Sequence, residues 1–474
     1  MDMTSRSGPA WWSDATLSSI DGHLFVEACD AVELAQRFGT PLYVMSEARL
    51  RANARRYRSA FAAAWPHGPV HVLPSLKANF SLAVARLLAA EELGCDVFGA
   101  AEFEVATRSG FSPELISLNG SVKDQAVIDA AVRACALITL DDRAELGRAA
   151  DAAGRVGRRA IIRLRGRPDY RGIELPTDFV DEPIPVSEAA RRYKAGIPTD
   201  DLLEVGREAL KRPDELALSG LMVHMPRHRT ELGLWRQASE RFADLVATAS
   251  DAWEGWRPRE LDVGGGLPTR RDPTGRLLSR IAGERRGDAP SVEEYAATIG
   301  SALTTRLGEH GVTLDGTALE VEPGRGLFAD AGIHLTTVRN VKRERRPVPW
   351  TWVETDTSEM FLLDSLVEHN RWPCIAASRA DEPERITADV VGRSCGFDLI
   401  APDSTLPPVD EGDVLAFLDT GAYQDASATN FNAMPRPGTV LVHDATAELV
   451  KRPETVHDVF ARDIVPDRLL QETL

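Results

Sequence analysis

The sequence has few of the features that mark secreted, membrane-spanning or metal-binding proteins. Its five cysteines in 474 residues are scattered and lack C-x-x-C spacing, which argues against a disulfide framework and against a zinc site. No apolar stretch is long enough to span a bilayer, and the first residues lack the apolar core of a signal peptide. We therefore expect a cytoplasmic protein without a bound metal.

Positive charge is also in deficit. The chain has 55 Lys and Arg residues against 72 Asp and Glu residues, a formal net charge of −17. Nucleic acids and anionic membranes repel such a surface. We expect neither as a partner, although a local basic pocket for one phosphate group is compatible with this charge.

The middle of the chain alternates between short apolar runs and helical stretches. One such pair is Leu137–Leu140 followed by a helix at residues 142–153. This rhythm predicts parallel βα units, and their number favours a (β/α)₈ barrel over an open sheet. We place the barrel at residues 46–332.

A second domain is predicted from a change of pattern. After residue 333, β-like runs separated by turns, such as Gly438–His443, predict an antiparallel β domain over residues 333–474. We assign residues 1–45 to the same domain and expect a strand near residue 25 to join it.

One lysine stands out at the end of an apolar run, His71-Val-Leu-Pro-Ser-Leu-Lys77. Burial of a lysine lowers its pKa and makes it a nucleophile toward aldehydes. A Schiff base between Lys77 and pyridoxal phosphate (PLP) is the chemistry that this placement suggests. On this stretch alone, an ordinary solvated lysine is the alternative.

Two further turns follow predicted strands. Three consecutive glycines, Gly264 to Gly266, let a backbone approach an anion closely and present N–H donors. Glu322, in Glu322-Pro-Gly-Arg325, lies where barrel active sites lie. A carboxylate there would keep a pyridine nitrogen protonated. Each motif alone is equally compatible with a plain turn.

Three single residues are weaker candidates. His224 ends a predicted strand and would offer a flat imidazole to a cofactor ring, or is a satisfied core histidine. Cys395 lies in a polar loop of the β domain and would serve as a general acid if the loop reaches an active site. Tyr423 follows Gly421-Ala and either binds a phosphate or closes the core.

In this order, the motifs resemble those of the fold-type III PLP-dependent decarboxylases, the family of diaminopimelate and ornithine decarboxylases. The resemblance covers about residues 20–450 and includes Leu76-Lys77-Ala-Asn79, Gly94-Cys-Asp96, Leu261-Asp-Val-Gly-Gly-Gly, Glu322-Pro-Gly-Arg325, Cys395 and Gly421-Ala-Tyr423. It implies a PLP-binding barrel, a β domain and a homodimer whose active sites lie at the interface.

The resemblance also implies site residues. Lys77 would hold PLP covalently, His224 would stack on its ring, and Glu322 would pair with the ring nitrogen. Cys395 would reach the partner's site and donate a proton. The remaining cofactor-binding residues implied are Asp96, Arg163, Arg227, Gly264, Gly265, Gly266, Gly324, Arg325 and Tyr423.

The chain departs from the family pattern around the expected substrate. Met225-Pro-Arg227 replaces a small Gly-Ser turn, so Arg227 would contact the phosphate through its charge. Gly396-Phe397 follows Cys395, where the family has an acidic or another specificity residue. The candidate substrate-binding residues are Asp356, Glu359, Asp364, Arg371 and Phe397. These changes lead us to expect a substrate other than meso-diaminopimelate.

The leading hypothesis is PLP-dependent decarboxylation of an amino acid. An amino-acid racemase or another PLP lyase on the same scaffold is the first alternative. A non-catalytic regulatory homologue is the second.

Overall fold

The computed structural model describes residues 16–167, 194–227, 229–269, 289–368, 370 and 372–469. These residues form two compact units, which are described separately. The barrel unit lies between Leu50 and Phe328, and the β unit takes in the chain up to Arg49 and from Ala329 onward. The expected domain limits, 46–332 for the barrel and 1–45 with 333–474 for the β domain, stay a prediction.

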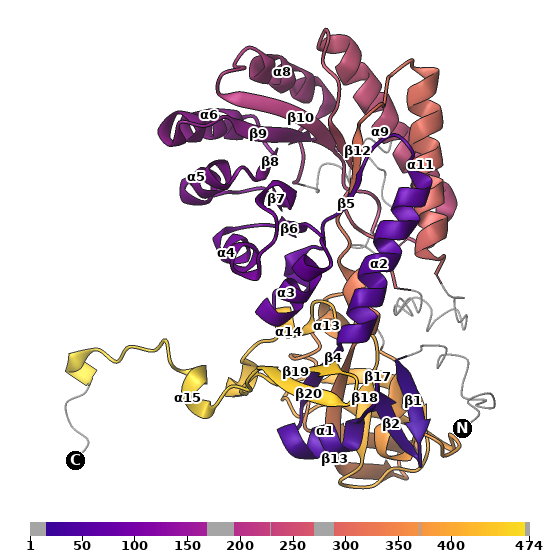
Figure 1. Ribbon diagram of the computed structural model, residues 1–474. Coiled ribbons are helices and arrows are strands. Elements are labelled where there is room, and N and C mark those ends of the chain that lie inside the picture. The colour runs from indigo at the N-terminus through magenta and orange to yellow at the C-terminus, as the bar shows by residue number, and fades with distance from the viewer. Residues whose placement is uncertain are drawn as a thin grey trace. The chain divides into compact units, whose positions relative to one another are not determined.

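The barrel unit is built on eight parallel strands in the order β5-β12-β11-β10-β9-β8-β7-β6 (Figure 1). β5 and β6 are the two ends of this order, and a parallel bridge between Ser75 and Asp96 connects them. The strands are β5 (Val70–Val72), β6 (Cys95–Val97), β7 (Ile116–Leu118), β8 (Leu137–Leu140), β9 (Ala160–Arg165), β10 (Leu216–Met222), β11 (Glu260–Asp262) and β12 (Ala318–Val321).

Helices alternate with these strands, as the sequence predicts. They are α2 (Glu47–Ala64), α3 (Leu82–Ala90), α4 (Ala100–Ser109), α5 (Gln125–Ala134), α6 (Ala144–Val156), α8 (Thr199–Leu210), α9 (Leu232–Ala252), α11 (Val292–Glu309) and α12 (Arg325–Phe328).

Local sequence signals set several helix ends. The Ser46 hydroxyl accepts from the Arg49 N–H at 3.1 Å, which begins α2. Ser291 and Glu294 form a reciprocal capping box at the start of α11. Gly110, with a φ of 84°, ends α4. The predicted barrel architecture is confirmed.

The β unit contains a nine-stranded sheet and a separate three-stranded sheet. The strands of the larger sheet are β4 (Leu42–Ser46), β13 (Gly332–Glu344), β14 (Trp350–Thr355), β15 (Cys374–Ala376), β16 (Ile386–Val391), β17 (Leu399–Leu406), β18 (Val414–Phe417), β19 (Gly438–His443) and β20 (Thr446–Lys451). The smaller sheet contains β1 (Leu17–Ile20), β2 (His23–Val26) and β3 (Cys29–Asp30).

The predicted β domain, with strands from the N-terminal segment, is confirmed, and the pairing of these strands adds detail. The strand near residue 25 is β2, which pairs with β1 and β3 in the smaller sheet. It is β4 that joins the larger sheet, between β13 and β19. The larger sheet is mixed, because β4 runs parallel to β19 and β14 runs parallel to β16.

Short helices complete the β unit: α1 (Ala31–Phe38), α13 (Asp364–Val367), α14 (Gln424–Ser427) and α15 (Val456–Val459). Asp30 caps α1 by accepting from the Val32 N–H at 2.7 Å. Leu34 and Ala35 of this helix are buried with Leu42, Val44 and other strand residues in one hydrophobic cluster. This cluster ties the N-terminal segment to the C-terminal strands.

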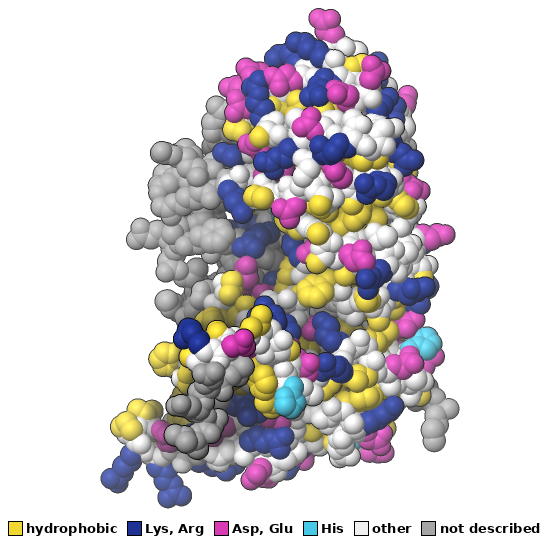
Figure 2. All heavy atoms as spheres, turned by 90° about the vertical axis from the view of Figure 1, so that its left-hand side faces the viewer, with side chains coloured by type: hydrophobic (Ala, Val, Ile, Leu, Met, Phe, Trp, Pro, Cys, Tyr) yellow, Lys and Arg dark blue, Asp and Glu magenta, His cyan; other side chains and the backbone are white. Residues whose placement is uncertain are grey.

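The surface carries both signs of charge. On the face shown in Figure 2, acidic and basic side chains are interspersed over the surface. Among the described residues, no helix is long and apolar enough to cross a membrane.

Candidate active site

Polar residues follow or end the strands of the barrel at their carboxyl ends. Parallel strands present these ends on one face, where barrel enzymes carry their active sites. One residue from each strand or from the turn after it lies at or near this face: Lys77, Asp96, Asn119, Asp141, Arg165, His224, Gly264 and Glu322. Asp96 lies within β6, Lys77 lies in the turn after β5, and Gly264 is the one residue of the set without a polar side chain.

Lys77 lies beside Asp96. It occupies a 3₁₀ turn, Leu76–Ala78, after β5, and its Nζ is 3.5 Å from Asp96 Oδ2. The amine also lies 4.3 Å from the centre of the Phe98 ring. The side chain of Lys77 is 41% exposed, so of the two alternatives left open by the sequence the amine is the accessible one. An accessible amine next to a buried carboxylate suits a group that must meet a ligand.

Asp96 itself is fully buried and strongly held. Ser75 Oγ donates to Asp96 Oδ2 at 2.5 Å, and Asn119 Nδ2 donates to Asp96 Oδ1 at 2.6 Å. These two donors fix the positions of both Asp96 oxygens next to Lys77.

Arg163 is the central cation of the barrel interior. It is fully buried and forms ion pairs with Asp262, with Glu320 and, at 3.2 Å, with Glu322. Thr139 and Ser117 each accept a hydrogen bond from it at 2.7 Å. Burial alone would lower the pKa of the Arg163 guanidinium, but the surrounding carboxylates raise it further above its usual value.

Glu322 is a buried carboxyl in an acidic neighbourhood. Burial, followed by the charges of Asp262 and Asp96, raises the pKa of Glu322 well above its usual range. Arg163 opposes this shift without cancelling it. Glu322 therefore favours a bound proton, or a ligand nitrogen that shares one.

His224 packs against the triple-glycine turn. A Cβ at Gly264 would lie 3.0 Å from His224 Cα, and a Cβ at Gly265 would lie 2.4 Å from the Glu322 carbonyl oxygen. Glycine is required here because any side chain would collide with the neighbouring backbone. Burial, then the charges of Arg165 and Lys77, lowers the pKa of His224 to about 3. The imidazole is thus neutral near pH 7, and its Nδ1 donates to the Met225 carbonyl at 2.8 Å.

The candidate phosphate-binding residues come from adjacent turns. A Cβ at Gly266, whose φ is +100°, would lie 2.9 Å from Arg227 Cα, so these two backbones touch. Gly324 and Arg325 are buried at the start of α12, after β12. Both arginines thus lie on turns that follow barrel strands, as does the triple glycine.

The β-unit candidates gather around one loop. Cys395 is exposed, and its backbone N–H donates to Asn432 Oδ1 at 3.1 Å. Phe397, in the same loop, is 98% exposed. Asp398 accepts from the backbone N–H of Glu359 at 2.6 Å, so the loop and Glu359 are linked.

Three other β-unit candidates have separate surroundings. Asp356 accepts hydrogen bonds from Thr40 Oγ1 at 2.7 Å and from Thr336 Oγ1 at 2.8 Å, which places it in the framework of this unit. Asp364 accepts from Gln424 Nε2 at 2.9 Å. Tyr423 has a φ of 69° and precedes α14.

Arg371 lies outside the described residues. The proposed roles of all these β-unit residues stay predictions.

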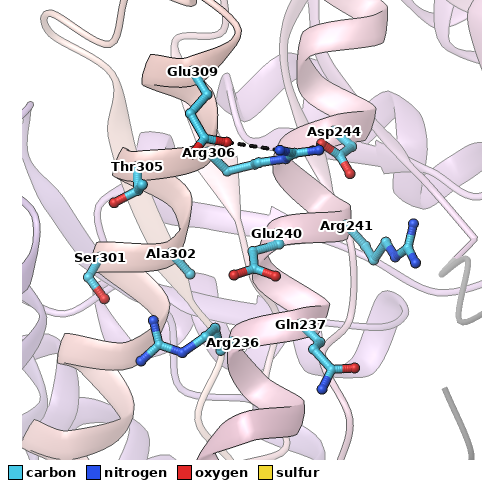
Figure 3. A pocket seen from close by; sticks show the side chains of 10 residues that line it. All are labelled: Arg236, Gln237, Glu240, Arg241, Asp244, Ser301, Ala302, Thr305, Arg306 and Glu309. Atoms are coloured by element: carbon cyan, nitrogen blue, oxygen red, sulfur yellow. Dashed lines mark hydrogen bonds and ion pairs between the residues drawn. The ribbon is translucent and has the colours of Figure 1, made fainter.

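A separate hollow lies on the outside of the barrel. It has a volume of about 480 Å³ and is lined by residues of α9 and α11, among them Arg236, Glu240 and Arg306 (Figure 3). Arg306 is already paired with Asp244 at 2.6 Å and with Glu309 at 2.8 Å. None of the strand-end residues lines this hollow, so it is distinct from the candidate active site.

Comparisons with known proteins agree with this geometry. The family model of the pyridoxal-dependent decarboxylases, pyridoxal binding domain, matches residues 47–329. The chain belongs to this family.

Relatives match nearly the whole length of this decarboxylase. It is 31% identical over 456 residues to the diaminopimelate decarboxylase of Methanothermobacter thermautotrophicus, covering 95% of this chain and 97% of the relative. It is 29% identical to the diaminopimelate decarboxylase of Methanocaldococcus jannaschii, covering 96% and 98%. A crystal structure of the M. jannaschii diaminopimelate decarboxylase with L-lysine matches with a TM-score of 0.84 at 27% identity, covering 96% and 99%.

Membership confirms PLP as the cofactor and decarboxylation as the class of reaction. The residues present suit PLP. Lys77 offers an accessible amine, Glu322 offers a carboxyl of raised pKa for a ring nitrogen, and His224 offers a neutral flat ring. The glycine turn and Arg227 offer backbone donors and a charge for a phosphate.

One expectation about this decarboxylase was wrong. The departures after His224 and Cys395 led us to exclude meso-diaminopimelate as the preferred substrate. The relatives that match over nearly full length are named diaminopimelate decarboxylases, which overturns that exclusion. Substitutions in two loops do not by themselves decide the substrate.

The sequence also left several site residues unnoticed: Asn119, Arg165, Asp262 and Glu320. Each lies in or directly after a barrel strand. The signal that identified Glu322, a polar residue at a strand's carboxyl end, applies equally to Asn119 and Arg165. Asp262 ends β11 and Glu320 lies within β12, and both are buried, where a charged residue signals a buried partner.

Proposed function

We propose that this protein is a cytoplasmic, homodimeric PLP-dependent decarboxylase that removes a carboxyl group from diaminopimelate and yields lysine. The observation that carries the proposal is the accessible Lys77 amine beside buried Asp96, with Asp96 linked through Asn119 to Glu322. The names of the full-length relatives support the substrate.

PLP supplies an aldehyde that bonds to amino groups and a ring that accepts the electron pair left by a departing carboxylate. Lys77 would hold the cofactor covalently, and Asp96 would stabilise positive charge on the Lys77 nitrogen. Glu322 would keep a proton next to the ring nitrogen, and His224 would cover one face of the ring. Gly264 to Gly266, Gly324, Arg325, Arg227 and Tyr423 would hold the phosphate, and Arg163 would anchor Glu322.

Cys395 would return a proton to the carbon that loses its carboxylate. Its thiol lies in an exposed loop together with Phe397. An exposed proton donor suits a loop that enters the site of a second copy. Glu359 lies next to this loop and would bind the substrate amine distant from the reaction, with Asp364 and Arg371 as further candidates.

The activity test separates the alternatives. PLP-loaded protein is incubated with diaminopimelate, and carbon dioxide, lysine and the stereochemistry of the remaining substrate are measured. Equal amounts of carbon dioxide and lysine are expected. Loss of substrate chirality without carbon dioxide would identify a racemase instead, and absence of both would reject catalysis of this substrate.

The shared-site proposal has its own test. Lys77→Ala and Cys395→Ala proteins are each expected to be nearly inactive. If each site combines Lys77 of one copy with Cys395 of the other, random mixing restores one intact site in half of the dimers, about a quarter of the original activity. No recovery on mixing, with dimers present, would place both residues in the same copy's site.

A further inference from the structure

Asn119 connects two carboxyl groups across the barrel. It follows β7 and is only 2% exposed. Its Nδ2 donates to Asp96 Oδ1 at 2.6 Å and to Glu322 Oε1 at 2.5 Å. One side-chain nitrogen thus uses both of its hydrogens on the two acids nearest to the proposed cofactor chemistry.

The orientation of this amide is fixed by its partners. Both neighbours of Nδ2 are carboxyl oxygens, which accept hydrogen bonds, so the nitrogen and not the oxygen of the amide must face them. Among the described residues, Asn119 Oδ1 accepts no hydrogen bond. The polar contacts of this buried side chain within the described chain therefore run to Asp96 and Glu322.

The backbone that carries Asn119 is held as well. The Asn119 N–H donates to the Val97 carbonyl at 2.7 Å. Buried Lys123 donates to the Gly120 carbonyl at 2.7 Å and to Glu145 at 2.8 Å. Because the turn is anchored on both sides, the amide cannot drift away from the two acids without breaking these contacts.

Glu322 Oε1 receives two donors, Asn119 Nδ2 at 2.5 Å and Arg163 Nη2 at 3.2 Å. A protonated carboxyl carries its hydrogen on one oxygen, and an oxygen that already accepts two N–H bonds is the poorer place for it. The proton of Glu322 therefore belongs on Oε2. Asp96 receives donors on both oxygens, from Ser75 and Asn119, so its carboxyl is held in place.

We propose that Asn119 is a positioning residue, which keeps the Glu322 proton on Oε2 and holds the Asp96 carboxyl beside Lys77. This inference rests on the proposed function, in which Lys77 and Glu322 hold the cofactor. In this proposal, the Asn119 amide connects Glu322, which would face the cofactor ring, with Asp96, which lies beside the Lys77 amine.

The test uses the PLP-loaded protein and two properties other than turnover. These are the dissociation constant for PLP and the pH at which the visible absorbance of the bound cofactor changes. In Asn119→Ala we expect PLP to bind about 10- to 100-fold more weakly, as for lost supporting contacts in other sites. We expect the absorbance midpoint to fall by about one pH unit, since an Asp96 carboxyl that has lost one donor is held less firmly beside the Lys77 nitrogen and stabilises its protonated form less.

Ser117→Ala is the matched control. Ser117 lies two residues earlier on β7, is equally buried, and hydrogen-bonds Arg163 rather than the two acids. The absorbance midpoint of Ser117→Ala should stay within about 0.3 pH units of that of the unaltered protein. Loss of the Ser117 hydroxyl leaves both hydrogen bonds of Asn119 in place. An equal shift in both variants would overturn the proposal, as would an unshifted Asn119→Ala.

Folding failure is covered by a second variant. If circular dichroism shows that Asn119→Ala does not fold, Asn119→Ser is measured instead. Serine keeps one hydrogen-bond donor, so we expect a smaller shift of the absorbance midpoint in the same direction. An unshifted serine variant would also overturn the proposal. If the unaltered protein takes up no PLP, the proposed function fails. If the unaltered protein takes up PLP and the Asn119 variants show the same affinity and midpoint, this inference alone fails.

Discussion

Lys77 Nζ lies 3.5 Å from Asp96 Oδ2, although the two residues come from the opposite ends of the barrel's strand order. Their strands are linked only by the Ser75–Asp96 bridge and neighbouring backbone hydrogen bonds, such as Asp96 N–H to the Pro74 carbonyl at 3.1 Å. Closure of the barrel therefore builds this pair. A chain that fails to close the barrel would lack the pair, and with it the proposed cofactor site.

Asp96→Asn tests the charge of this pair. The amide has the shape of the carboxyl but lacks its charge, so the Lys77 nitrogen loses its anionic neighbour. We expect PLP affinity to fall by about 10-fold or more, with the fold intact. Fluorescence titration with PLP measures the affinity, and circular dichroism checks the fold. Unchanged affinity would show that Asp96 does not act on the cofactor.

Arg163→Met tests the interior charge network. The substitution keeps much of the side-chain length but leaves Asp262, Glu320 and Glu322 without their shared cation. Removing one partner of a buried ion pair typically costs about 3–5 kcal/mol, because the remaining charges stay desolvated. Urea unfolding of the apoprotein measures the loss. A loss below about 1 kcal/mol would mean that protonation of the acids compensates for the missing guanidinium.

The buried carboxyl of Glu260 should make the free energy of unfolding depend on pH. Burial, then the charge of Glu320, raises its pKa from 4.5 to about 7. The folded state therefore favours the protonated form. The stability that this preference contributes is fully present below pH 4.5 and is lost as the pH rises through about 7.

Glu260→Gln should remove this dependence, because the amide cannot ionise. Between pH 5 and pH 8, the free energy of unfolding of the variant should rise by about 2 kcal/mol relative to that of the unaltered protein. Urea unfolding at both pH values measures the difference. Glu309→Gln, an exposed site on α11, serves as the control and should differ by less than about 0.5 kcal/mol at either pH. A constant difference for Glu260→Gln would contradict the assigned shift.

Much of the fold follows from local sequence signals. The predicted limits of β8 and β19 agree with the structure, because these strands are short apolar runs bounded by turn residues. The place of β4 in the larger sheet did not follow from the sequence, since its pairing with β13 and β19 joins residues about 290 to 400 positions apart.

The candidate site was predictable where a motif is compact. Lys77, Gly264 to Gly266 and Glu322 each stand out in a short stretch. Asn119 did not, because an asparagine after a strand reads as an ordinary turn residue. Its partners, Asp96 and Glu322, lie 23 and 203 residues away in the chain.

The substrate was the least predictable feature. The exclusion of diaminopimelate rested on single substitutions near Arg227 and Gly396, without knowledge of what else lines the site. A specificity pocket is a sum of contacts from several loops. Full-length similarity to diaminopimelate decarboxylases weighs more than two altered turns.

The central claim is that Lys77 holds PLP for decarboxylation. The most direct measurement compares the unaltered protein with Lys77→Ala, recording the visible absorbance of bound cofactor and the release of carbon dioxide from diaminopimelate. The account predicts an absorbance band and stoichiometric carbon dioxide for the unaltered protein. In Lys77→Ala it predicts loss of that band and a fall in turnover of about 10³-fold or more. A Lys77→Ala protein that keeps both the band and full turnover would contradict it.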